Sequence, residues 1–260
     1  MIDSDFRTRV ESSLRQIEAE EAVRILYACE SGSRAWGFPS QDSDYDVRFI
    51  YRHELEWYLS VDVETKRDVI ECPVTGHIDI SGWDLRKALK LMAKSNPPLL
   101  EWIRSPIVYL DPVGFGSRLR AISDRYYSPR ACAFHYLHMA RGNVREYLRG
   151  DTVWLKKYFY VLRPLLAIRW IESGCGQVPM EFDVLVEVGV KDKPLKSAIG
   201  RLLQRKIAGE ELDRGPRIAE ISDFIDQEMS RHDATPHWEP GEPANESEID
   251  CFFREELNAK

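Results

Sequence analysis

Cysteine is scarce in this chain of 260 residues, and long apolar runs are absent. The five cysteines are odd in number and widely spaced, and no C-x-x-C pair occurs, so neither a disulfide framework nor a zinc knuckle is predicted. We therefore expect reduced thiols, no disulfide-linked partner and a cytoplasmic location. No apolar stretch reaches the roughly 20 residues that cross a bilayer, and residues 1–13 lack the apolar region of a secretory signal. We expect no membrane partner.

Positive charge is also in deficit, because 36 Lys and Arg stand against 43 Asp and Glu, for a formal net charge of −7. This balance argues against broad, charge-driven binding to long nucleic acid, although it leaves room for a local basic groove. The 7 Trp, 11 Tyr and 10 Phe, together with 43% apolar residues, exclude a disordered chain. The length can bury one large core or two small ones.

The sequence pattern changes between residues 113 and 125, from strands mixed with helices to helices alone. The first part is predicted to hold a buried strand at 22–30, an alternating strand at 44–52 and two more strands at 67–72 and 76–81, with helical spacing at 6–21 and 83–95. From residue 113 strand patterns disappear and the segments carry helical spacing. A Pro-rich linker at 234–247 precedes a last short helix. We predict a domain of strands and helices over residues 1–125, followed by a helical domain over 126–260.

Two acids lie two residues apart on the strand predicted at 44–52. Asp44 and Asp46 project from one face, while Tyr45 and Val47 point into the core. Carboxylates this close repel each other unless a cation lies between them. Mg²⁺ prefers such oxygen ligands and keeps positions for waters and substrate phosphates. The pattern therefore favours a metal site, although a solvated turn leading into an edge strand fits the same residues.

The Gly32-Ser33 pair precedes these acids by ten residues, at the end of a predicted strand. Gly32 lets the backbone approach a phosphate closely, and the Ser33 hydroxyl can donate to a phosphate oxygen. Arg34 is a candidate for a second phosphate contact. The alternative is that the pair simply caps a short helix.

A third acid, Asp79, stands between Ile78 and Ile80 on another predicted strand. A charge in such a strand is costly unless it is paired or binds a metal. Asp79 is therefore expected either to complete the metal site, where it could also deprotonate an attacking hydroxyl, or to pair with an arginine such as Arg48 or Arg86.

The helical half carries one unusual segment, residues 156–171. Lys156, Tyr160 and Arg163 share a helical face, and Pro164 is expected to kink or restart the helix. One interpretation is a buried helix edged by snorkelling cations. The other is that Lys156 or Lys157, with Tyr160, reaches the triphosphate or the base of a nucleotide.

Residues 31–51, followed by His77-Ile-Asp-Ile-Ser81, resemble the DNA polymerase beta superfamily of nucleotidyltransferases. Within it, residues 95–109, 142–148 and 156–171 add a likeness to the RNA repair pathway (RlaP-like, YcgL-like) group. The resemblance implies an α+β fold, in which a mixed sheet is flanked by helices and a helical domain closes the nucleotide cleft.

The same resemblance implies a reaction. It implies that Asp44, Asp46 and Asp79 hold two Mg²⁺ ions, with Mn²⁺ as a substitute, and that Gly32 and Ser33 hold the triphosphate of an NTP. A nucleoside monophosphate would pass to a hydroxyl with release of pyrophosphate. The acceptor stays open among an RNA or tRNA end, a protein side chain and a small molecule. A non-catalytic nucleotide-binding or interaction module is the alternative function, and a phosphohydrolase using the same acids is a weaker third.

Overall fold

The computed structural model describes residues 3–234 and 246–259, which form two compact units. Unit 1 comprises residues 1–35, 44–127 and 242–260, and unit 2 comprises residues 36–43 and 128–241. The domain boundary predicted at residue 125 stays a prediction. These units differ from it in two places, because segment 36–43 belongs to the helical unit and the C-terminal residues belong to the sheet unit.

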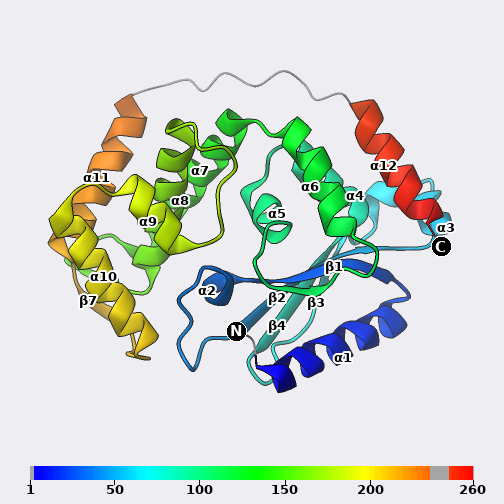
Figure 1. The fold of residues 1–260 in the computed structure, drawn as a ribbon, viewed down its shortest axis with the longest axis horizontal. Coiled ribbons are helices and arrows are strands. Elements are labelled where there is room, and N and C mark those ends of the chain that lie inside the picture. Colours follow the sequence, from blue (N-terminus) through cyan, green and yellow to red (C-terminus); the bar gives the residue numbers. More distant parts are fainter. Residues whose placement is uncertain (1–2, 235–245, 260) are drawn as a thin grey trace. The chain divides into compact units, whose positions relative to one another are not determined.

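Unit 1 is built on a five-stranded mixed sheet with the order β3-β4-β2-β1-β5 (Figure 1). Its strands are β1 (Arg24–Ser31), β2 (Tyr45–Arg52), β3 (Val69–Glu71), β4 (Ile78–Asp84) and β5 (Val108–Leu110). Strands β2 and β4 run parallel, and the other neighbours are antiparallel. This mixed sheet with flanking helices confirms the expected α+β fold.

Helices cover both faces of the sheet of unit 1 (Figure 1). Helix α1 (Ser4–Glu21) lies on one face, where its apolar stripe packs against alternate residues of β2, including Val47 and Phe49. The other face carries α4 (Leu85–Ala93), α5 (Pro97–Trp102) and α6 (Phe115–Tyr126). Short turns α2 (Gly32–Ala35), α3 (Leu55–Tyr58) and the 3₁₀ helix Val63–Thr65 complete the unit. Because β2 alternates, Asp46 and Arg48 project from the face opposite α1.

The last helix, α12 (Glu246–Asn258), belongs to unit 1 and confirms the short helix predicted at the C-terminal end. Glu256 is buried and accepts from Arg118 Nη2 at 2.6 Å. The ring of Phe252 lies 5.8 Å from that of Phe115. The predicted Pro-rich linker falls mainly on residues 235–245, outside the described residues.

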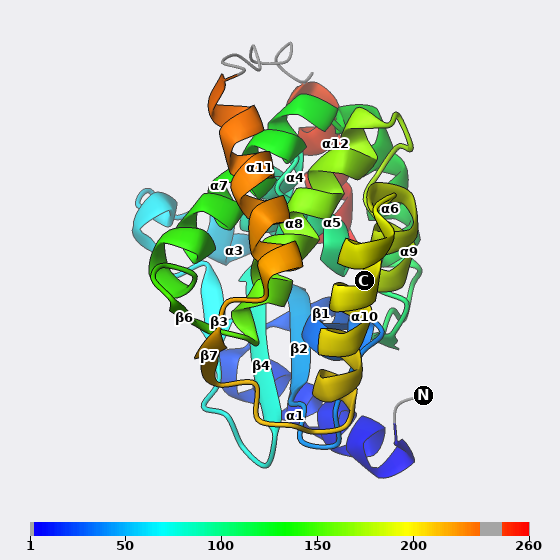
Figure 2. The ribbon, with the colours of Figure 1, turned by 90° about the vertical axis from the view of Figure 1, so that its left-hand side faces the viewer.

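Unit 2 is mainly helical (Figure 2). Its helices are α7 (Pro129–Tyr147), α8 (Lys157–Glu172), α9 (Phe182–Gly189), α10 (Lys193–Ile207) and α11 (Ala219–Ala234). Helix α8 is its buried centre, and it continues through Pro164 rather than restarting there. Among the helices that the structure describes, none has both the length and the apolar character needed to cross a membrane.

A two-stranded ribbon is the exception to the helical character expected after residue 113. Strand β6 (Thr152–Trp154) pairs antiparallel with β7 (Arg214–Pro216). Each strand has three residues, which is too short for a period of two to stand out in the sequence.

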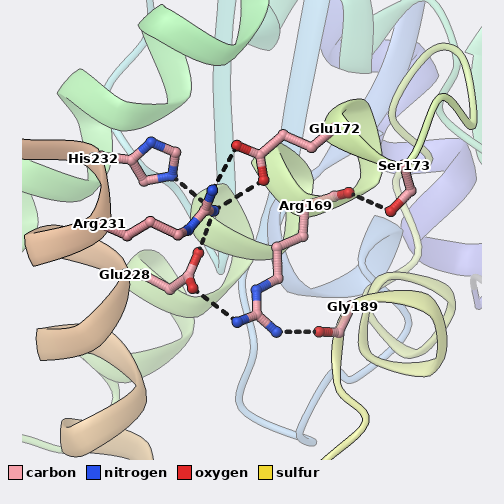
Figure 3. A network of polar contacts seen from close by, with 7 residues as sticks. All are labelled: Arg169, Glu172, Ser173, Gly189, Glu228, Arg231 and His232. Atoms are coloured by element: carbon pink, nitrogen blue, oxygen red, sulfur yellow. Dashed lines mark hydrogen bonds and ion pairs between the residues drawn. The ribbon is translucent and has the colours of Figure 1, made fainter. Parts of the chain in front are cut away.

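Helices α8 and α11 are joined by a network of charged side chains (Figure 3). Glu228 of α11 accepts from Arg169 of α8 at 2.8 Å and from Arg231 at 2.7 Å. Arg231 also forms an ion pair with Glu172 at 2.8 Å. Burial of Glu228 acts to raise its pKa, but the hydrogen bonds from the two arginines outweigh burial and lower that pKa. The carboxylate is thus held charged between two helices.

Candidate functional site

Gly32 and Asp46 are in direct contact where β1 ends and β2 begins. Ser31 is the register partner of Asp46 in the antiparallel β1–β2 pair. Gly32 follows with a φ of +61°, and a Cβ atom at this position would overlap Oδ2 of Asp46. Only glycine leaves room for the carboxylate against this backbone. The two motifs, separated in the sequence by ten residues, are therefore in immediate contact.

Asp79 lies beside Asp46 on the neighbouring parallel strand, because the two residues are register partners of β2 and β4. The guanidinium of Arg48 lies between them. Its Nη2 is 2.7 Å from Asp79 Oδ2 and 3.5 Å from Asp46 Oδ1, and its Nη1 donates to the carbonyl of Asp79 at 3.1 Å. Of the partners considered for Asp79, the structure thus gives it Arg48.

Asp44 lies apart from this pair, just before β2. Its Oδ1 is 3.3 Å from Nδ1 of His77, and both side chains are largely exposed. Across residues 3–234 and 246–259, no group of three His, Cys, Asp or Glu side chains is arranged to hold a metal ion. The structure therefore brings Asp46 and Asp79 together but does not join Asp44 to them.

Arg34 packs against the first residues of the DxD strand. Its guanidinium lies over the ring of Tyr45, 3.8 Å from the ring centroid, and its Nε donates to the carbonyl of Asp44 at 3.2 Å. Phe6 of α1 stacks on the same tyrosine. These contacts fix Arg34 next to Asp44. Ser33 lies half-buried in the neighbouring turn α2.

Glu30 holds the backbone of Asp46 through a hydrogen bond. Glu30 was not identified as a site residue from the sequence. The residue is completely buried at the end of β1, and its Oε1 accepts from the backbone N–H of Asp46 at 2.8 Å. Its Oε2 accepts from the hydroxyl of Tyr109. Burial raises the pKa of Glu30 to about 7. The available signal was an acid at the end of an otherwise apolar strand, the same signal that drew attention to Asp79.

The chemistry of these donors fits a divalent cation. Asp46 and Asp79 are neighbouring carboxylates, and neighbouring carboxylates attract a positive charge. A guanidinium fills this role here. Carboxylate oxygens are also the ligands that Mg²⁺ and Mn²⁺ accept.

The other predicted nucleotide contacts lie in unit 2. Lys157 Nζ is 4.3 Å from the ring centroid of Tyr147 and 4.6 Å from that of Tyr160. Lys156 is exposed immediately before α8. Arg163, predicted on their face, is buried instead and donates to the carbonyls of Pro179 and Met180 at 3.3 Å. Whether Lys156, Lys157 or Tyr160 binds a nucleotide stays a prediction.

Segment 36–43, which links the two motifs, is anchored within unit 2. The carbonyl of Trp36 accepts from the N–H of Phe182 at 3.0 Å, and the ring of Phe38 lies 4.9 Å from that of Phe159. The buried Lys206 of α10 donates to the Ser40 hydroxyl at 2.8 Å. Trp36 thus anchors this segment.

Comparisons with known proteins give matches of three kinds: to a family model, to a curated protein and to solved structures. The model of the RlaP family, the RNA repair pathway DNA polymerase beta family, matches residues 6–255. The uncharacterized protein YcgL of Bacillus subtilis (strain 168) is 52% identical over 225 residues, which cover 86% of each chain. A crystal structure of a nucleotidyltransferase-like protein from Exiguobacterium sibiricum 255-15 is 12% identical with a TM-score of 0.33, and the match covers 95% of this chain and 88% of that one. At that TM-score, the structural similarity supports no conclusion.

Proposed function

Because this chain belongs to the RNA repair pathway DNA polymerase beta family, we propose that it is a metal-dependent nucleotidyltransferase. It transfers a nucleoside monophosphate from an NTP to a hydroxyl acceptor and releases pyrophosphate. Family membership supports the nucleotidyltransferase type of activity. The observation that carries the proposal is the contact between Gly32 and Asp46, because it puts a glycine backbone next to a carboxylate that pairs in register with Asp79.

Each side chain has a role in this proposal. Asp46 and Asp79 would hold Mg²⁺ or Mn²⁺, which would supply positive charge to the phosphates and the attacking oxygen. Asp44 would join them by turning away from His77. Gly32, Ser33 and Arg34 would contact the triphosphate, as would Lys156 or Lys157 with Tyr160. Glu30 holds the backbone of Asp46 in place by accepting a hydrogen bond from its N–H.

The chemical step is a displacement at the α-phosphorus. The acceptor oxygen forms a bond to this phosphorus while the bond to the bridging oxygen of the pyrophosphate breaks, and pyrophosphate leaves. The acceptor hydroxyl loses its proton to a base, for which Asp79 is the candidate. Acceptors that fit this step are an RNA or tRNA end, a protein side chain or a small molecule.

The test is transfer of label from NTPs that carry ³²P at the α-phosphate, with Mg²⁺ or Mn²⁺ and with RNA, tRNA or a cell extract. We expect label on one acceptor class, and we expect Asp46→Asn and Asp79→Asn to abolish its transfer while the thermal unfolding midpoint is kept. Asp62→Asn, an exposed acid of the same unit, is the control and should transfer as wild type does. Absence of label on every acceptor would contradict the proposal.

One observation favours a second candidate, a non-catalytic nucleotide-binding or interaction module. The ion pair between Arg48 and Asp79 gives the third acid a structural partner, so its presence does not require a metal. If this candidate is right, Asp79→Asn will lower the unfolding midpoint, and the wild-type protein will bind NTP without transferring label. Equilibrium dialysis with labelled NTP, run beside the transfer assay, separates the two functions.

A further inference from the structure

The ribbon of unit 2 presents an exposed aromatic ring opposite an arginine, and an exposed lysine follows two residues along the chain. Residues 152–156 alternate, so that Thr152, Trp154 and Lys156 are exposed while Val153 and Leu155 are buried. Trp154 is 41% exposed and is the direct register partner of Arg214 on β7. The backbone N–H of Lys156 donates to the carbonyl of Leu212 at 3.0 Å. Backbone pairing of the two segments therefore continues past Trp154, and Lys156 lies exposed in the turn that leads into α8.

The two cations beside Trp154, Lys156 and Arg214, are not neutralised by acids. Within the described part of unit 2, neither Lys156 nor Arg214 forms an ion pair, whereas Arg205 and Arg217 each bind a carboxylate. The printed contact of Arg214 is to a backbone carbonyl, that of Thr152, at 3.5 Å. Their charges therefore stay available to an anion.

A cavity of about 490 Å³ opens beside the same strand. Arginines line it together with two acids: Arg205, Arg214, Arg217, Glu211 and Asp213. Its volume is within the range of small-molecule sites in proteins. Arg214 belongs both to the cavity and to the ribbon, whereas the other two arginines of the cavity already bind carboxylates.

We propose that this face, which we call the Trp154 ribbon (Trp154, Lys156 and Arg214), binds a single-stranded polynucleotide. A base stacks on the indole of Trp154, and the adjoining phosphates bind the two cations, which is how proteins hold single strands without reading their sequence. The proposal rests on the proposed function, because it names the acceptor as a nucleic-acid strand, and it leaves Lys157 rather than Lys156 for the triphosphate. It also reconciles a net charge of −7 with nucleic acid as a partner, since the contact is local.

The test is fluorescence anisotropy of labelled 12-nucleotide RNA and DNA strands of one sequence, and of their duplexes, titrated with the full chain in EDTA without NTP. We expect the chain to bind single strands more tightly than duplexes. Comparison of the RNA and DNA strands shows which type of nucleic acid it prefers. Trp154→Ala should weaken binding about tenfold, while Trp154→Phe should keep most of it because a stacking ring remains. Arg214→Ala should lower the slope of log affinity against log salt by about one.

Controls come from the same unit. Phe134→Ala removes an aromatic ring that is 55% exposed on α7, and Arg201→Ala removes an exposed arginine of α10. Both should bind within about twofold of wild type, and circular dichroism should give all variants the wild-type spectrum. Loss of binding in Trp154→Ala with a wild-type spectrum supports the proposal.

Two results overturn it: a wild-type chain that binds no strand, or a Trp154→Ala chain that binds as wild type does. If Trp154→Ala instead changes the mass in light scattering and leaves strand binding intact, the face is a protein contact and the proposal fails. Because neither metal nor NTP is present, this outcome is independent of the transfer assay. A protein that transfers no label can still bind strands through Trp154, and the reverse also holds.

Discussion

Gly32 controls the closest approach between the two sequence motifs of unit 1. The Gly32→Ala substitution puts a Cβ atom where Oδ2 of Asp46 lies, and the positive φ adds strain of about 1 kcal/mol. We expect the Asp46 carboxylate to be displaced, with at least a tenfold loss of α-phosphate transfer and a small fall in the unfolding midpoint. Radiolabel transfer and differential scanning fluorimetry measure the two effects.

Gly200 supplies the matched control for that substitution. It lies within α10, and a Cβ atom there meets no heavy atom within 4 Å. Gly200→Ala should keep wild-type transfer and gain up to about 1 kcal/mol of stability, because alanine favours the helix. Wild-type transfer by Gly32→Ala would show that the position of Asp46 does not matter for the reaction.

At the level of elements, the start of α4 depends on a buried acid. Asp84 caps this helix by accepting from the N–H of Arg86 at 2.9 Å, and it also accepts from the hydroxyl of Tyr58 at 2.6 Å. Burial raises its pKa from about 3.8 to about 6. Between these values the folded chain holds this proton more tightly than the unfolded chain, so the free energy of unfolding falls as the pH rises.

The Asp84→Asn variant removes that dependence and keeps an oxygen for the cap. Relative to this variant, we expect wild type to lose up to about 3 kcal/mol of unfolding free energy between pH 4 and pH 6. Urea unfolding at half-unit steps of pH measures the difference. If the unfolding free energies of the two proteins changed with pH in parallel, Asp84 would not titrate between pH 4 and pH 6.

The pairing of α8 with α11 depends on Glu228, the acid between two arginines in Figure 3. Glu228→Gln leaves these cations without their buried countercharge, and we expect a loss on the order of 3 kcal/mol in unfolding free energy. Glu220→Gln, in an ion pair at 3.2 Å with the largely exposed Arg201, should cost less than about 1 kcal/mol. Equal losses in chemical denaturation would contradict a special role for the buried acid.

The elements that the sequence predicts are those with enough residues to show a period. Helix α1 and strands β1, β2 and β4 follow the expected segments within a few residues. Strands β6 and β7 were missed because three residues show no alternation. The spacing of glycine and acids indicates Gly32, Asp44 and Asp46, of which the structure brings Gly32 and Asp46 into contact and leaves Asp44 beside His77. Arg48 is one of the two arginines that the sequence offers to Asp79, and the β2–β4 register decides between them. Glu30 depends on burial, which spacing does not determine.

For the molecule as a whole, stability of the sheet unit depends on the end of the chain. Phe252 of α12 is 5% exposed and contacts Phe115. Phe252→Ala should cost about 3 kcal/mol, with faster hydrogen exchange of the α6 amides. Arg254→Ala, an exposed residue of the same helix, should stay within about 0.5 kcal/mol of wild type. Unchanged exchange in α6 would show that α12 does not support this unit.

Assignment of segments to units is the level at which sequence patterns are least informative. Composition changes near residue 113, which is the basis of the two-part division. It carries no signal that segment 36–43 packs with α8, α9 and α10 or that α12 returns to the sheet unit. Both depend on contacts between residues far apart along the chain, such as Ser40 with Lys206 and Arg118 with Glu256.

The path of segment 36–43 has a practical consequence for protein engineering. The chain leaves the sheet unit after Ala35, packs within the helical unit over residues 36–43, and returns to the sheet unit at Asp44. A chimera that exchanges the helical unit with that of a relative must therefore also exchange this segment, which lies in the sequence between two parts of the sheet unit. A junction placed solely near residue 127 would leave Trp36, Phe38 and Ser40 facing foreign side chains.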